Sequence, residues 1–154
     1  MSRKPVPVPE LAIDTILYAT LSDAQKCERR IVANLCAHLH GAGFALIGLH
    51  DGDAHNSIDG ATLSLAEATR QVMELAFTLT DCRIWFRKGK LDGLNGLAKA
   101  VILVFGNGNG GLNVIADHSA PSPDPEGWNE AMAAFDVRQF ASSARADTEP
   151  MQGP

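Results

Sequence analysis

The most apolar segment of the chain, residues 100–105, ends at a glycine-rich stretch, residues 106–111. Residues 82–87 before it alternate apolar and polar side chains, and residues 112–117 after it do so more loosely. Alternation with a period of two is typical of strands. We therefore predict three consecutive strands in an antiparallel meander, with residues 100–105 as its central strand.

A fourth strand is predicted at residues 44–50, where both alternating sets of side chains are apolar. Residues 101–105 share this property, so each face of the sheet needs a cover. Helices on both faces would provide it, and so would helices on one face and a second copy of the protein on the other. The connection from the strand at residue 44 to the strand at residue 86 is long enough for a right-handed crossover, which predicts that these two strands run parallel.

Helices are predicted where apolar residues recur at helical spacing behind a capping signal. Ser22 with Gln25, and Ser64 with Glu67, have the spacing of a capping box. Asp124 is placed as an N-cap, with Pro125 at the first helical position of a third helix. A short helix within residues 10–19 would be the fourth. The predicted fold class is an α+β sandwich, in which three to four helices cover a mixed sheet of about four strands that contains the meander.

Length and composition indicate one folded domain. The 154 residues are 45% hydrophobic and 20% charged, which is ordinary for a globular protein. We expect a single domain at residues 10–141, between disordered tails at residues 1–9 and 142–154. No apolar run approaches the roughly 20 residues of a membrane span. The N-terminus lacks the apolar run of a secretory signal, so we expect the protein to stay where it is made. With three cysteines and no Cys-x-x-Cys pair, a cytoplasmic location without disulfides is predicted.

The charge is unevenly placed. The net charge is −5, yet residues 81–100 hold five basic residues against two acidic ones, a balance of +3. On the strand in this region, Arg83, Trp85 and Arg87 share one face, where an aromatic ring between two cations could stack a nucleic-acid base. The negative total charge argues against a general nucleic-acid binder. A half-covered tryptophan flanked by solvated charges is the commoner explanation.

Carboxylates and imidazoles gather in the loop after the first strand and at the end of the last one. This candidate metal site comprises His50, Asp51, Asp53, His55, Asp117 and His118. These side chains are ligand types for zinc, manganese or iron. They converge only if the strands ending at His50 and Asp117 are parallel and adjacent. The alternative is that they are ordinary loop residues with local backbone hydrogen bonds.

Three leucines, Leu91, Leu94 and Leu97, lie between the first two strands of the meander. Their spacing of three favours a short helical turn that folds back on the core; the alternative is an exposed contact surface. The glycines of residues 106–111 do not match a phosphate-binding loop, because no lysine follows them and the next segment is a predicted strand. A hairpin turn is the preferred interpretation.

The absence of a converging acid, base and nucleophile shapes the functional prediction. We expect a small cytoplasmic binding or protein-interaction domain without catalytic activity or cofactor, acting as a homodimer. Its predicted partner surface combines the three leucines with Arg83, Trp85 and Arg87. The first alternative is a metal-dependent, hydrolase-like enzyme that uses the candidate metal site. The second is a nucleic-acid-associated module that uses the face with Arg83, Trp85 and Arg87.

Overall fold

The computed structural model describes residues 19–90 and 93–141 of the chain. The helix predicted within residues 10–19 and both predicted tails lie almost wholly outside this part. The helices and strands of the described part follow in chain order: α2 (Asp23–Gly41), β1 (Phe44–His50), β2 (His55–Ser57), α3 (Leu65–Ala76), β3 (Asp81–Lys90), β4 (Gly93–Val104), a short 3-10 helix (Asn109–Gly111), β5 (Ile115–His118) and α4 (Trp128–Ala134).

The strands form one sheet of five in the order β2-β1-β3-β4-β5. Each neighbouring pair is antiparallel. The predicted α+β class and the meander β3-β4-β5 are thus confirmed, whereas the mixed sheet of about four strands is wrong. In place of the predicted parallel arrangement, β1 and β3 are antiparallel, with Leu49 opposite Ile84.

The short strand β2 explains this error. It was predicted as loop, but it runs back along β1, with His55 opposite His50. The chain therefore returns to the start of β1 before it enters α3. The helix then leads back to the end where β1 finished, and Arg83 near the start of β3 pairs with His50. A crossover without β2 would have given the parallel pair.

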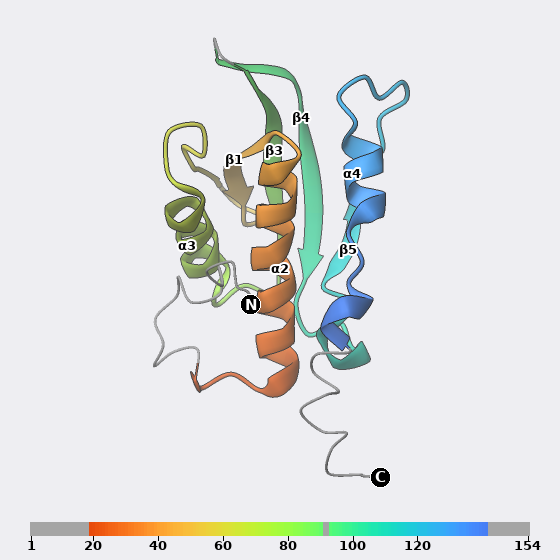
Figure 1. The fold of residues 1–154 in the computed structure, drawn as a ribbon. Helices are drawn as coiled ribbons and strands as arrows, with labels where there is room; N and C mark the ends of the chain where they lie inside the picture. Colours follow the sequence, from red (N-terminus) through yellow and green to blue (C-terminus); the bar gives the residue numbers. More distant parts are fainter. Residues whose placement is uncertain (1–18, 91–92, 142–154) are drawn as a thin grey trace, which may run out of the picture.

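All three helices lie on the same face of the sheet, with α2 across its middle (Figure 1). Trp128 of α4 is fully buried, with its ring edge-on to Phe44 at a centroid distance of 5.1 Å. Val101 and Leu103 of β4 are also fully buried on this side. Burial of side chains of this size stabilises the fold by about 1.5–3 kcal/mol each. The core therefore lies between the helices and one face of the sheet.

The capping signals set the helix starts. The hydroxyl of Ser22 accepts a hydrogen bond from the Gln25 amide at 3.1 Å, and the Gln25 side chain accepts one from the Ser22 amide at 2.8 Å. The hydroxyl of Ser64 accepts from the Glu67 amide at 3.1 Å. The α4 helix starts at Trp128 rather than at Pro125. Its N-cap residue is Gly127 and not the predicted Asp124, although the Asp124 carboxylate accepts hydrogen bonds from the amides of Trp128 and Asn129 at 3.1 and 2.7 Å.

The turns of the meander differ from the prediction. Strands β3 and β4 extend to Lys90 and Gly93 and pair there, so the leucine-bearing stretch from residue 93 onward is strand and not a helical turn. Strand β5 begins at Ile115, because the 3-10 helix occupies the preceding residues. That helix packs on α2. Just before it in the chain, the Gly106 amide donates a hydrogen bond to the Glu28 carboxylate of α2 at 2.7 Å. In the described part of the chain, no helix is long and apolar enough to cross a membrane.

Candidate interaction surface

The second face of the sheet has no helix on it among the described residues. We call it the open face, and define it by the side chains that are cross-strand neighbours on this side: Ala45, Gly48, His50, His55, Ser57, Asp81, Arg83, Trp85, Arg87, Ala100, Ile102, Val104 and Asp117. The antiparallel register assigns these residues, because directly paired positions lie on the same side of a sheet. The described helices lie together on the other side of the sheet (Figure 1).

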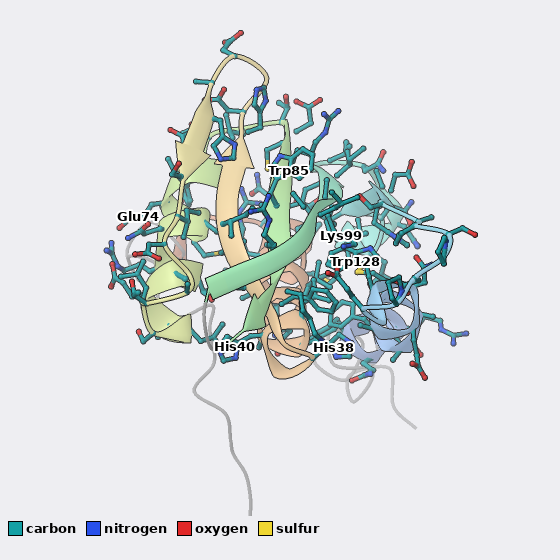
Figure 2. The ribbon with its side chains drawn as sticks, turned by 90° about the horizontal axis from the view of Figure 1, so that it is seen from above. His38, His40, Glu74, Trp85, Lys99 and Trp128 are labelled. Atoms are coloured by element: carbon teal, nitrogen blue, oxygen red, sulfur yellow. The ribbon has the colours of Figure 1, made fainter. Side chains whose placement is uncertain are left out.

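Trp85 occupies the centre of the open face. It is paired with Gly48 on one side and with Ala100 on the other. Neither neighbour has a side chain larger than a methyl group, and the space over Gly48 is occupied by the imidazole of His55. Ala100 is only 8% exposed although no described helix covers it. Figure 2 shows Trp85 on the side of the sheet away from Trp128 and His38. The centre of the open face is therefore apolar and aromatic.

One cross-strand row connects both ends of the sheet. Directly paired positions run through all five strands, from β2 to β5: His55, His50, Arg83, Ile102 and Asp117. The imidazoles thus lie on the β2 side of the open face, and a carboxylate lies on the β5 side. The surface is polar and charged around its apolar centre.

The two arginines flank Trp85 along β3. Arg83 is exposed, whereas Arg87 is partly buried opposite Ala45. The Nε of Arg87 is buried and has no hydrogen-bond partner among the described residues. A buried donor without a partner is unfavourable, and an acceptor from outside would relieve it. Tryptophan and arginine are also the residue types that most often dominate the binding energy of protein interfaces.

The loop members of the candidate metal site make local hydrogen bonds. The Asp51 carboxylate accepts from the amides of Asp53 and Ala54, both at 2.9 Å. The two hydrogen bonds hold the pKa of the Asp51 carboxyl below its ordinary value, and the bond from Ala54 contributes most. Nδ1 of His50 accepts from the Gly52 amide at 3.1 Å. These interactions are those of a polar turn.

The other two members of that site lie elsewhere. Asp117 is on β5, which β3 and β4 separate from β1, so it lies about 14 Å from His50 at the usual strand spacing. His118 is paired with Val101 and so belongs to the helix-covered face. The condition of parallel, adjacent strands is not met. Within residues 19–90 and 93–141, no three His, Cys, Asp or Glu side chains are grouped so as to hold a metal ion. Elemental analysis would test the metal prediction directly.

Only one of the three predicted contact leucines has a described side chain. Leu97 is 79% exposed on β4. Leu91 and the side chain of Leu94 lie outside the described part. Sequence reasoning missed Lys99, which is 6% exposed and lies opposite buried Phe86. Its position in the same alternating set as Val101 and Leu103 was the available signal.

Comparisons with known proteins provide no relative of this chain. No protein-family model, no curated protein and no solved structure matches it.

Proposed function

We propose that the protein is a non-catalytic interaction domain that forms a homodimer through the open face of its sheet. The observation that supports this most is the one-sided cover: helices protect one face, while the other presents Trp85 among small apolar neighbours. An antiparallel sheet that faces water on one side normally has polar residues there. Instead, Ala45, Ala100, Ile102 and Val104 interrupt the polar positions. Ala45 and Ala100 are buried, whereas Trp85, Ile102 and Val104 are half-buried and remain partly accessible. Accessible apolar side chains that adjoin one another are typical of protein-interaction sites.

The charges of the open face favour a protein partner. Two arginines, Arg83 and Arg87, are balanced by two aspartates, Asp81 and Asp117. A surface that follows a phosphate backbone needs an excess of cations. A neutral mixture around an aromatic centre has the composition of a protein interface.

The placement of these charges favours a second copy as that partner. Consider two copies packed open face to open face, with a two-fold axis parallel to β3 and midway between the sheets. Because β3 is the central strand, this axis would place β5 of one copy over β2 of the other. Asp117 of each copy would then face His55 of its partner, and the two Trp85 rings would meet at the centre. Two-fold contacts, in which each copy uses the same surface, are the commonest in homodimers. Two sheets that pack face to face in this way lie about 10 Å apart. The partner would also bring acceptors to the unpaired Nε of Arg87.

The size of the surface sets the expected affinity. The open face is five strands wide and extends along β3 from Asp81 to Arg87. The usual spacing between strands and the usual rise per residue give this surface an area of about 500 Å² per copy. Specific interfaces usually bury about 800 Å² per partner. The open face is therefore at the small end of the range, and we expect a dimer that dissociates on dilution.

The first experiment measures the mass of the full chain by light scattering over a wide concentration series. We expect the mass to approach twice the 16.4 kDa of the chain as the concentration rises. Trp85→Arg should return the protein to monomer, because it places a charge at the centre of the interface. Its thermal unfolding should change little, because the side chain lies outside the core.

Leu97→Arg is the matched control: it changes an exposed leucine away from the open face and should leave the dimer intact. A wild-type monomer at the highest soluble concentration would refute the proposal, as would dissociation by Leu97→Arg alone.

A charge exchange tests the two-fold geometry. Asp117→Lys and His55→Glu should each weaken self-association, because like or unmatched groups would then face each other. An equal mixture of the two variants should form a heterodimer, since the lysine introduced on β5 of one copy would face the glutamate introduced on β2 of the other. If the mixture associates no better than either variant alone, these two side chains do not meet.

One observation supports nucleic acid as a second candidate partner. Arg83 and Arg87 lie two residues to either side of Trp85, the arrangement of a base-stacking site. Titration with a single-stranded oligonucleotide would quench Trp85 fluorescence in a salt-dependent way if this candidate is correct. We expect no quenching in the wild type beyond that of Trp85→Phe.

A further inference from the structure

A cavity of about 460 Å³ lies beside the first half of β4, between that strand and the segment at residues 119–126. Its volume is within the range of small-molecule sites, about 300–1,000 Å³. Most of its wall is apolar and consists of Leu97, Ala98, Ala120, Pro121, Pro123 and Pro125. The cavity therefore offers an apolar ligand shelter from water.

The pairing of β4 explains why the cavity exists. β5 pairs with β4 only along Val101–Leu103, and after Ser119 the chain leaves β4. The departing segment is held in place by the start of α4. The indole Nε1 of Trp128 donates to the Ser119 carbonyl at 2.9 Å, and the Asn129 side chain donates to the Pro121 carbonyl at 2.6 Å. These bonds to a helix preform the cavity wall.

An ion pair between buried Lys99 and half-buried Glu126 lines this apolar cavity. Lys99 is 6% exposed, and its Nζ donates to the Leu97 carbonyl at 2.9 Å and to the Glu126 carboxylate. An ammonium group has three donors, and the third has no partner among the described residues. The second carboxylate oxygen of Glu126 likewise accepts no hydrogen bond there. The pair thus has one free donor and one free acceptor and is neutral as a whole. The remaining charged residue of the lining is Asp124, and each oxygen of its carboxylate already accepts a hydrogen bond, one from the Trp128 amide and one from the Asn129 amide.

We propose that this cavity binds a small uncharged molecule with an apolar body and an amide group. The carbonyl of the amide would accept from Lys99, and its N–H would donate to Glu126. A carboxylate ligand would satisfy Lys99 but would face the Glu126 charge, and an ammonium ligand would face the Lys99 charge. Of these three head groups, only the neutral amide satisfies both residues without an unpaired charge. This activity is separate from dimer formation, because the cavity is not part of the open face.

Three probes with one apolar body test the head-group preference: cyclohexanecarboxamide, cyclohexanecarboxylate and cyclohexylmethylammonium. Binding to the full chain is followed by the NMR shifts of the backbone amides of Ala98, Lys99 and Ser119. We expect millimolar binding of the amide, at least about fivefold tighter than either charged probe, as one additional good hydrogen bond gives. Equal binding of all three probes, or no shifts with any of them, would refute the proposal.

Two variants make the test specific to the ion pair. Glu126→Gln leaves the ammonium of Lys99 without its counter-ion, so the preference should change from the amide to the carboxylate. Leu97→Ala removes only apolar wall at the exposed rim; it should weaken all three probes alike and keep their order. Thermal unfolding verifies that each variant is folded. If Glu126→Gln is folded and the order of the probes does not change, Lys99 does not contact the head group. If Glu126→Gln does not fold, the wild-type order together with Leu97→Ala still decides the proposal.

Discussion

The imidazole of His55 lies over the Cα of Gly48 and occupies the space that a side chain on Gly48 would need. The two residues are on neighbouring strands, since Gly48 pairs with Ser57 and His50 pairs with His55. A glycine in a strand often marks such a close approach. The ring thus extends across β1 toward the centre of the open face.

We expect Gly48→Ala to destabilise the fold by about 1–3 kcal/mol, as overpacking does. The new methyl group would overlap the ring of His55 and lie 3.0 Å from the Asn56 carbonyl. In a His55→Ala background the same substitution should cost about 1 kcal/mol less, because the side-chain overlap is gone. Urea unfolding of the four proteins gives this coupling energy. Additive effects would show that the ring moves aside freely.

Leu103→Ala and Ser64→Ala compare a core residue with a helix cap. Leu103 is fully buried against the helices, so its truncation should cost about 2–5 kcal/mol. Ser64→Ala removes one hydrogen bond to the Glu67 amide and should cost about 1 kcal/mol. Chemical unfolding measures both. Equally mild effects would contradict the position of Leu103 in the core.

Gly111→Ala should be much more disruptive than Gly110→Ala. Both glycines have positive φ, 100° and 65°, so each substitution strains the backbone, by about 1–2 kcal/mol. A Cβ on Gly110 would meet nothing within 4 Å, whereas one on Gly111 would lie 3.1 Å from the Cβ of Cys27 on α2. The unfolding free energies should therefore differ by about 2 kcal/mol. Similar losses would mean that the 3-10 helix can shift away from α2.

The buried cysteines predict a loss of stability at high pH. Burial raises the pKa of the Cys36 thiol from an ordinary value of 9.0 to about 12. Burial, with smaller contributions from Asp81 and Asp51, does the same for Cys82. The unfolded chain releases these protons from about pH 9 upward while the folded chain retains them. Unfolding therefore becomes easier as the pH rises from about 9 to about 12.

Two substitutions isolate this effect. Cys36→Ala and Cys82→Ala should each flatten the alkaline fall in the unfolding free energy, although each also lowers the stability at neutral pH. Thiol reagents at mildly alkaline pH provide a second measurement, and they should modify these two residues only when the protein unfolds. Rapid modification of the folded chain would contradict their burial.

Local signals in the sequence predicted α2, α3 and the strands of the meander well. The capping residues Ser22 and Ser64 act through bonds between near neighbours in the chain, so the sequence alone indicates where α2 and α3 start. The alternation in β3 likewise assigned Arg83, Trp85 and Arg87 to one face. Each of these features depends on residues close together in the sequence.

Features that depend on distant pairing were not predictable in this way. Strand β2 has three residues and a polar sequence, and only its bonds to β1 make it a strand. An irregularity in the pairing between Leu46 and Gly48 shifts the register of β1 against β3. The sequence does not reveal this shift, so it could not show that Gly48 lies beside Trp85. The ion pair of Lys99 with Glu126 depends in the same way on two segments that only the fold brings together.

The two outermost strands limit how copies of this protein can associate. β2 and β5 have three and four residues, so each offers few unpaired backbone groups to an incoming strand. Beyond the end of β5, Pro121, Pro123 and Pro125 line the cavity beside β4, and proline has no amide hydrogen to donate to a growing ladder. Short outer strands and prolines are known protections against the addition of strands from other molecules. The outer strands β2 and β5 therefore offer a strand of another molecule little to pair with.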